Sequence, residues 1–255
     1  MITSTANEKI KHVTELVRNA KARRKEGLFV VEGTRIAAEI PKEALVECFV
    51  SEDFSSSGTT GEIFPYDVDV TPVSSAVFRK MSDTQNPQGI ICVCRKSAFS
   101  EEDLPKDPGC ALKLLILEGI QDPGNLGTMV RTAEGAGFDA VIADNSTVDV
   151  YNPKVTRSTM GSVFRVPVIY TSDLPGVIDR LQKSAVTVFA AHLKGSIDYR
   201  DVKYGNRIAF MIGNEGAGLT DEICKMADTL VRIPMHGKLE SLNAAVAAAI
   251  LMFHV

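Results

Sequence analysis

The feature that most constrains the fold is a regular alternation of apolar runs and helix-like segments in the second half of the chain. Strand-like runs occupy residues 113–119, 138–144, 185–192, 207–213 and 229–234, and helix-like segments occupy 125–137, 152–161, 174–184, 220–227 and 241–253. Strands that alternate with helices predict a parallel sheet covered on both faces. Ligands of such sheets bind outside the carboxyl ends of the strands. The loops EGIQDPGNLG, AAHLKGS, IGNEGAGL and IPMHGKLESLN are therefore the candidate site.

The first half of the chain predicts a smaller α/β unit. Its basic amphipathic helix covers residues 7–27 and ends at Gly27, and a Ser/Gly-rich loop covers 51–63. Strands are expected at 28–33, 44–50 and 89–96, with helices at 34–40 and 74–83. An acidic, proline-containing segment follows. The predicted organisation is a domain at 1–97, a linker at 98–111 and a second domain at 112–255.

Composition excludes several classes of protein. Hydrophobic content of 45% and charged content of 24% are those of an ordinary globular protein. The charged N-terminal residues MITSTANEKIK do not resemble a signal peptide, and the apolar run AAVAAAILMF is too short to span a bilayer, so we expect a cytoplasmic protein without membrane partners. The five cysteines form no C-x-x-C pair and the four histidines are dispersed, so no metal site is expected.

Charge is unevenly distributed along the chain. The net charge is −4, yet residues 1–35 carry eight Lys/Arg against four Glu, which leaves +4 there and −8 in the remainder. This basic segment can be a solvated helix face, or it can be a binding surface for an anionic polymer such as RNA.

The loop IGNEGAGL (212–219) lies between a strand-like run and a helix-like segment. Its spacing is neither the dinucleotide fingerprint nor a nucleoside triphosphate loop, and Glu215 would repel phosphate. The glutamate suits a ligand that bears donors or positive charge. A tight turn with Glu215 near a helix N-terminus is the structural alternative.

Two further loops carry candidate polar groups. In IPMHGKLESLNAAVAAAI, Ser241 stands where a helix cap is expected, Asn243 lies just inside, and alanines would allow close approach of a ligand; a buried helix with an ordinary cap is the alternative. In EGIQDPGNLGTMVRTAEGAG, Asn125 and Arg131 are expected to point toward the same end of the sheet. A buried Arg131 would need an anionic partner, and a surface salt bridge is the alternative.

Together the three stretches resemble a known family. The order N-x-G-x-x-x-R-x-A, I-G-N-E-G-x-G-L and I-P-M-x-G-x-x-x-S-L-N-x-x-x-A is similar to the signature motifs of the SpoU/TrmH family of RNA ribose 2′-O-methyltransferases. The N-terminal part resembles that family's L30e-like substrate-binding domain. The resemblance implies an α/β fold: a C-terminal parallel-sheet SPOUT domain with a deep trefoil knot, preceded by a small L30e-like domain, in a homodimer whose active site uses both subunits.

The resemblance also implies the cofactor and its site. The cofactor would be S-adenosylmethionine, held by residues that match motif positions or lie beside them: Leu193, Gly213, Asn214, Ile233, Met235, Leu242 and Asn243. The catalytic residues would be Asn125, Arg131, Glu215, Ser241 and Asn243. Arginine keeps its proton and is a poor base. We therefore expect Arg131 to hold the RNA phosphate and the developing alkoxide, which leaves the acceptor of the hydroxyl proton open. Asn125 and Glu215 would orient Arg131, while Ser241 and Asn243 would orient the cofactor and the neighbouring RNA.

RNA would be bound by basic residues of both parts: Lys9, Lys11, Arg23, Arg24, Arg35 and Arg157. The segment NPKVTRSTMGSVFR resembles the RNA-facing part of the family, although Thr159 replaces its usual serine. Arg157 and Arg165 are candidates to contact phosphates there, and a surface or core salt bridge is the alternative for both. Ribosomal RNA of the 23S type is the expected substrate because transfer-RNA members often lack the appended domain. A transfer-RNA methyltransferase and a non-catalytic RNA-binding protein on the same fold are the alternatives.

Overall fold

The computed structural model describes residues 1–56, 63–193 and 197–255. Part of the predicted Ser/Gly-rich loop, at 57–62, and the end of the AAHLKGS loop lie outside these ranges. The chain folds into two compact units. The first consists of residues 1–98 and 149–164, and the second of residues 99–148 and 165–255. The segment at 149–164 therefore packs with the N-terminal unit, which the sequence does not reveal.

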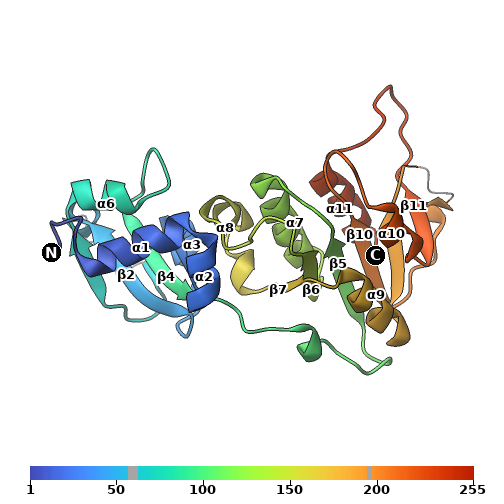
Figure 1. Cartoon of the computed structure of the whole chain (residues 1–255), viewed down its shortest axis with the longest axis horizontal. Coiled ribbons are helices and arrows are strands. Elements are labelled where there is room, and N and C mark those ends of the chain that lie inside the picture. Colours follow the sequence, from blue (N-terminus) through green and yellow to red (C-terminus); the bar gives the residue numbers. More distant parts are fainter. Residues whose placement is uncertain (57–62, 194–196) are drawn as a thin grey trace. The chain divides into compact units, whose positions relative to one another are not determined.

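The first unit is built on a four-stranded sheet of order β1-β4-β2-β3. Its strands are β1 (Leu28–Glu32), β2 (Leu45–Ser51), β3 (Val70–Val73) and β4 (Ile90–Arg95). Its helices are α1 (Glu8–Arg18), α2 (Ala20–Glu26), α3 (Thr34–Ala37), α4 (Glu52–Ser56), α6 (Ser75–Met81) and α8 (Pro153–Thr159). Figure 1 labels the strands β2 and β4 and the helices α1, α2, α3 and α6. Alternate residues of the strands face the α1/α6 core, which includes Val30, Phe49, Ile91 and Val93.

The basic helix predicted at 7–27 is two helices rather than one. Asn19 adopts an extended conformation between them, and its side chain accepts from the backbone N–H groups of Lys21 and Ala22. Asn at a helix N-cap is favoured because its short side chain satisfies these otherwise unbonded donors. The predicted end at Gly27 is confirmed, since Gly27 has φ of 66° and accepts no side chain without strain.

The second unit contains a seven-stranded parallel sheet of order β7-β6-β5-β10-β8-β11-β9. The strands are β5 (Leu112–Leu117), β6 (Ala140–Asp144), β7 (Val168–Thr171), β8 (Thr187–Ala191), β9 (Ile197–Asp198), β10 (Arg207–Ile212) and β11 (Thr229–Arg232). The helices are α7 (Pro123–Gly135), α9 (Leu174–Lys183), α10 (Asp221–Lys225) and α11 (Ala244–Met252), with 3-10 turns at Glu101–Asp103 and Tyr199–Asp201. The predicted parallel sheet is confirmed.

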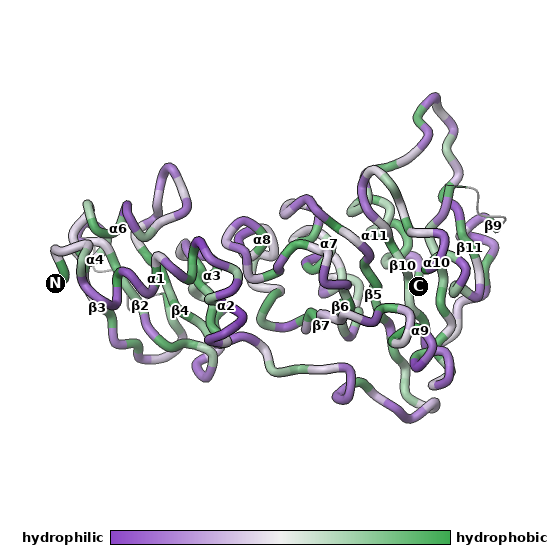
Figure 2. Tube along the Cα trace, viewed as in Figure 1, coloured by the Kyte–Doolittle hydropathy of each residue, from purple (hydrophilic) through white to green (hydrophobic). Residues whose placement is uncertain are grey.

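Helices cover both faces of this sheet. α9 and α10 pack on one face, against Leu114, Ile142, Val188 and Met211. α7 and α11 pack against each other, and they also contact β6 and β10 respectively. Hydrophobic residues dominate the central strands β5 and β10 (Figure 2), as expected for strands buried on both sides.

The segment predicted as a linker is fastened to the second unit. Leu104 lies in the core of that unit, and the buried Arg207 guanidinium donates to the carbonyl groups of Pro105, Asp107 and Cys110 at 2.9–3.0 Å. These bonds satisfy a charged group that would otherwise be costly to bury. They hold the segment at the end of the sheet where the strands begin, opposite the candidate site.

Candidate functional site

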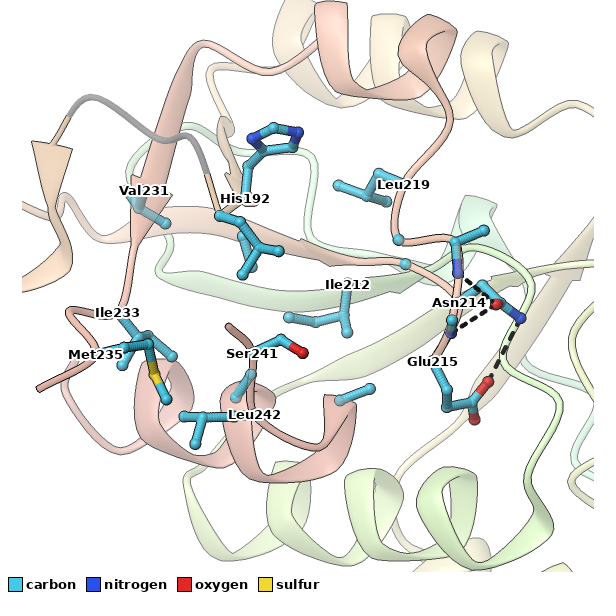
Figure 3. A pocket seen from close by; sticks show the side chains of 18 residues that line it. His192, Ile212, Asn214, Glu215, Leu219, Val231, Ile233, Met235, Ser241 and Leu242 are labelled. Carbon is cyan, nitrogen blue, oxygen red and sulfur yellow. Dashed lines mark hydrogen bonds between the residues drawn. The ribbon is translucent and has the colours of Figure 1, made fainter. Parts of the chain in front are cut away.

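A pocket of about 310 Å³ opens where β8, β10 and β11 end. Its wall combines the ends of these strands, the loop from Gly213 to Leu219, and the chain that enters α11 (Figure 3). Ile212, Leu219, Val231, Ile233, Met235 and Leu242 make the lining mainly apolar, and polar groups come from His192, Asn214, Glu215 and Ser241. Pockets of this size, apolar with a few polar groups, are typical small-molecule sites.

Six of the seven residues expected to hold the cofactor line this one pocket. They are Leu193, Gly213, Asn214, Ile233, Met235 and Leu242, and the seventh, Asn243, caps the adjoining helix. Sequence reasoning missed Ala191, His192, Ile212, Leu219 and Val231, which line it as well. Their positions in the sequence could have indicated them, because they lie at or just after the carboxyl ends of apolar runs or at the end of the glycine loop.

The loop IGNEGAGL is closed on itself. Asn214 and Gly218 exchange both backbone hydrogen bonds, at 3.0 and 2.9 Å, and the side chain of Asn214 accepts from the N–H groups of Gly216 and Ala217. A Cβ atom on Gly213 would overlap the backbone of Gly218 and Leu219. The glycine is thus required for close backbone approach rather than for holding phosphate.

Glu215 binds N–H groups at the start of α7. Its carboxylate accepts from the backbone of Gln121 (3.1 Å) and Asp122 (3.0 Å) and from the Asn125 side chain (3.0 Å). Burial alone would raise the pKa of Glu215, but these hydrogen bonds outweigh it and hold the pKa below its ordinary value. The carboxylate is therefore anionic at neutral pH. It joins the loop IGNEGAGL to the loop EGIQDPGNLG that enters α7.

Asn125 connects Glu215 to Asn243. Its amide nitrogen donates to Glu215, and its Oδ1 accepts from Nδ2 of Asn243 at 2.9 Å. Oδ1 of Asn243 in turn accepts from the backbone of Ala245 and Val246. An ionised carboxylate can only accept hydrogen bonds, so Asn125 must turn its NH₂ group toward Glu215 and its oxygen toward Asn243. Asn243 must then turn its NH₂ group toward Asn125 and its oxygen toward α11. The three motif loops are thereby bonded into one network.

The expected helix cap at Ser241 is wrong, because α11 begins at Ala244 and Asn243 is its N-cap. Asn243 is favoured since its carbonyl reaches two free N–H groups at once. Ser241 lines the pocket instead and is exposed. Across the described part of the chain, its hydroxyl has no hydrogen-bond partner.

Arg131 is exposed, which contradicts the expectation that it lies buried beside an anionic partner. The described residues also provide no salt bridge or hydrogen bond for its side chain, so the surface-salt-bridge alternative is wrong as well. Six residues along a helix correspond to roughly 600° of rotation, so Asn125 and Arg131 leave α7 in directions about 120° apart. Asn125 joins the network and Arg131 does not. Orientation of Arg131 by Asn125 and Glu215 therefore has no contact to support it.

The residues expected to bind RNA differ in their availability. Lys9, Lys11, Arg24 and Arg35 are exposed. Lys9 pairs with Glu47 at 3.4 Å and Lys11 with Glu8 at 3.6 Å, and such surface pairs are weak enough for phosphate to replace them.

Arg23 is wrongly assigned to RNA. Its side chain is only 3% exposed, pairs with Asp149 at 2.9 Å, and donates to the carbonyl groups of Leu16 and Val17. A guanidinium with these bonds is structural, and it ties α1 to the segment at 149–164.

The segment at 149–164 also contains partly available groups. Arg157 is half-buried and pairs with Asp83 at 3.1 Å, and Thr159 is fully buried and donates to the carbonyl of Thr156. Arg165, just after the segment, pairs with Glu134.

Neither a metal cluster nor a membrane span occurs among the described residues. Within residues 1–56, 63–193 and 197–255, no three His, Cys, Asp or Glu side chains gather as a metal site would require. Over the same ranges, no helix combines the length and apolar character needed to cross a bilayer.

Comparison with known proteins gives a consistent result. A family model described as the SpoU rRNA Methylase family matches residues 113–253, and one described as the MRM3-like substrate binding domain matches residues 7–92. The 23S rRNA (guanosine(2553)-2′-O)-methyltransferase RlmP of Bacillus subtilis (strain 168) is 35% identical over 262 residues, which cover 100% of this chain and 98% of that protein.

Solved structures agree with these matches. The AdoMet-bound rRNA methyltransferase from Sinorhizobium meliloti has a TM-score of 0.81 at 31% identity and covers 99% of this chain and 95% of its own. The SpoU methyltransferase AviRb from Streptomyces viridochromogenes, in complex with the cofactor AdoMet, has a TM-score of 0.84 at 22% identity, with coverage of 97% and 96%. At that identity the second likeness concerns the fold alone.

Proposed function

We propose that this chain, which belongs to the SpoU rRNA methylase family, transfers a methyl group from S-adenosylmethionine to a ribose 2′-oxygen of ribosomal RNA of the 23S type. In the balanced reaction, the S–CH₃ bond of the sulfonium breaks and the O–CH₃ bond forms. The products are a neutral thioether, a 2′-O-methyl ribose and the proton of the former hydroxyl.

The proposal rests on one observation: residues from three distant parts of the sequence share one hydrogen-bond network, and that network reaches the wall of one pocket at Glu215. Asn125 lies in the middle of this network and is hydrogen-bonded to Glu215 on one side and to Asn243 on the other. Glu215 and Ser241 line the pocket. A network of this kind positions reacting groups in advance, which is a main source of rate enhancement in group transfer.

The pocket fits S-adenosylmethionine by the chemistry of its lining. Ile233, Met235 and Leu242 supply apolar walls, and the backbone of the Gly213–Leu219 loop supplies polar groups at close range because Gly213 carries no side chain. When bound, the cofactor supplies an already activated methyl group. The protein therefore has to position the ribose and exclude competing water rather than activate the donor.

The five residues assigned to catalysis divide into two roles. The side chains of Asn125, Glu215 and Asn243 form hydrogen bonds with one another and with backbone N–H groups at the starts of helices, so they are positioning residues. Arg131 and Ser241 have unengaged polar groups among the described residues. We assign Arg131 to the RNA phosphate and the developing alkoxide, and Ser241 to orienting the cofactor and neighbouring RNA at the mouth of the pocket.

RNA is held by exposed basic residues of the first unit, namely Lys9, Lys11, Arg24 and Arg35, with Arg157 in addition. The match of residues 7–92 to a substrate-binding domain supports this assignment. The likeness of the whole chain to a 23S rRNA methyltransferase favours ribosomal RNA over transfer RNA. A cytoplasmic location, expected from the sequence, fits a protein that acts on such RNA.

A second copy of the chain completes the site in this proposal. Val246 in α11 and Phe253 at its end are 48% and 65% exposed, and their spacing of seven residues places them on the same side of the helix. The family's homodimer would cover them. We also propose the family's deep trefoil knot for the second unit. The strand order is compatible with it, since β10 comes late in the chain but lies between β5 and β8 in the sheet.

The test is transfer of labelled methyl from S-adenosylmethionine to purified ribosomal RNA, with purified transfer RNA as the parallel substrate. The proposal expects incorporation into the large ribosomal RNA. Incorporation into transfer RNA alone would show that transfer RNA, not ribosomal RNA, is the substrate. Cofactor binding without transfer to either RNA would favour a non-catalytic RNA-binding protein.

A further inference from the structure

A second cavity, distinct from the cofactor pocket, lies wholly within the first unit. It encloses about 340 Å³. Three aromatic residues line it: the rings of Phe29 and Tyr151 lie 4.6 Å apart between centroids, and those of Phe29 and Phe164 lie 5.7 Å apart. Phe29 and Tyr151 are buried, and Phe164 is the partly exposed ring of the three. Phe29 belongs to β1, whereas Tyr151 and Phe164 flank α8. The segment at 149–164 therefore helps to form this cavity.

Two cations stand at the rim of the cavity. Arg95 ends β4, Lys96 follows it, and both line the cavity; neither side chain has a hydrogen bond or salt bridge in the described part of the chain. The Lys96 ammonium lies 4.5 Å from the centroid of the Tyr151 ring. A cation over an aromatic face is held in place, but its charge remains unneutralised.

The surroundings of Lys96 favour an added anion. Burial lowers the pKa of Lys96, Asp149 opposes this effect, and the charges of Arg23 and Arg24 reinforce it. The Asp149 carboxylate is bonded to Arg23 and to the backbone of Tyr151, so it does not bond Lys96. An anionic group at the rim would compensate the desolvated ammonium.

One acidic side chain shares the rim. Glu43 lines the cavity, is exposed, and has no bonded partner in the described chain. A carboxylate accepts hydrogen bonds from exocyclic amines, which guanine, adenine and cytosine carry and uracil lacks. A partly exposed aromatic ring, two cations without an anionic partner and one unbonded carboxylate, all lining one cavity in the described part of the chain, together match the parts of a single nucleotide.

We propose that this cavity is a subsite for one unstacked nucleotide of the RNA substrate, with its base against the partly exposed Phe164 ring, its amine toward Glu43 and its phosphate on Arg95 and Lys96. Unpaired bases that stack on aromatic side chains are the usual means by which proteins read RNA. The proposal rests on the proposed function in that the ligand is part of an RNA, and it adds a contact with that RNA within the first unit.

The chain contains no tryptophan, so Phe164→Trp places one fluorescent reporter at the cavity wall. Guanosine 5′-monophosphate should quench this reporter saturably and more tightly than uridine 5′-monophosphate. Absence of saturable quenching by guanosine 5′-monophosphate overturns the subsite, provided that the reporter protein binds ribosomal RNA as the wild type does.

The second arm measures affinity for purified ribosomal RNA by filter binding. Arg95→Ala/Lys96→Ala should weaken binding roughly five- to tenfold, and Ala44→Phe, which fills the cavity without changing charge, should weaken it as well. Arg79→Ala/Lys80→Ala removes two exposed cations of α6 and serves as the charge-matched control. Equal RNA affinity of the cavity variants and this control overturns the proposal, and it does so even if mononucleotides bind.

These outcomes are separable from failure of the proposed function. Each variant is also titrated with S-adenosylmethionine, whose pocket lies in the second unit and should be unaffected. Wild-type protein that methylates RNA while its cavity variants bind RNA normally would contradict the subsite alone. Wild-type protein that transfers no methyl group would contradict the enzyme proposal.

Discussion

The side chain of Asn243 donates to Oδ1 of Asn125 at 2.9 Å, although 118 positions separate the two residues in the chain. Each amide has its second polar end committed: Asn125 to the Glu215 carboxylate and Asn243 to the N-terminus of α11. The bond therefore joins the starts of α7 and α11 to the glycine loop. Its position predicts how the site responds to substitution.

Asn125→Ala should lower methyl transfer by roughly 10- to 100-fold, the loss expected when a hydrogen bond to a charged group is removed. Asn125→Asp is the sharper variant because it places a second carboxylate 3.0 Å from Glu215 and repels it. Single-turnover rates with saturating cofactor measure the effect. Rates within twofold of wild type for both variants would show that the network does not position the reacting groups.

Gly213→Ala should abolish cofactor binding, because the added methyl overlaps the backbone of Gly218 and Leu219 and forces the loop open. Gly216→Ala, in the same loop, is the control: its Cβ would meet only Oδ1 of Asn214 at 3.6 Å. Calorimetry with S-adenosylmethionine and thermal melting compare the two. Cofactor affinity near that of the wild type in the Gly213 variant would mean that the loop does not need this close backbone approach to form the pocket wall.

Acid should destabilise the protein partly through Glu215. Its pKa is lower in the folded protein than in the unfolded chain, so its stabilising contribution is fully present above the unfolded pKa and is lost as pH falls through the folded pKa. Below about pH 4.5 the wild type should therefore lose thermal stability more steeply than Glu215→Gln. Parallel slopes for the two proteins between pH 3 and pH 6 would contradict this assignment.

Arg23→Ala should destabilise the first unit by about 3 kcal/mol, since it leaves Asp149 without its partner in a largely buried ion pair. Arg24→Ala should leave stability nearly unchanged and instead weaken RNA binding, because Arg24 is exposed. Urea unfolding and filter binding separate the two effects. An Arg23 variant of wild-type stability that binds RNA poorly would restore its assignment to RNA.

Much of the second unit follows from local pattern. The apolar runs at 113–119, 138–144 and 207–213 form β5, β6 and β10, because strands buried on both faces must be continuously apolar. Strands β3, β7 and β9 are short, of four, four and two residues, and their sequences did not distinguish them from loops. Six of the predicted cofactor residues meet at one pocket because strands of a parallel sheet end at a common edge.

The side-chain partners could not be predicted in the same way. The Asn125–Asn243 bond and the choice of Asn243 over Ser241 as helix cap depend on where α7 and α11 come to lie, which tertiary packing decides. The burial of Arg23 depends on Asp149, which lies far away in sequence. A basic helix in isolation does not reveal which of its cations faces inward.

The most direct test of the account is the position of the methyl group on ribosomal RNA treated with wild-type protein and with Arg131→Ala. A 2′-O-methyl ribose protects the adjacent phosphodiester from alkaline cleavage, so the modified nucleotide appears as a gap in the hydrolysis ladder. We predict one new gap with the wild type and none with Arg131→Ala, which should still bind S-adenosylmethionine with unchanged affinity. A methyl group on a base, or an undiminished gap with the Arg131 variant, would contradict the account.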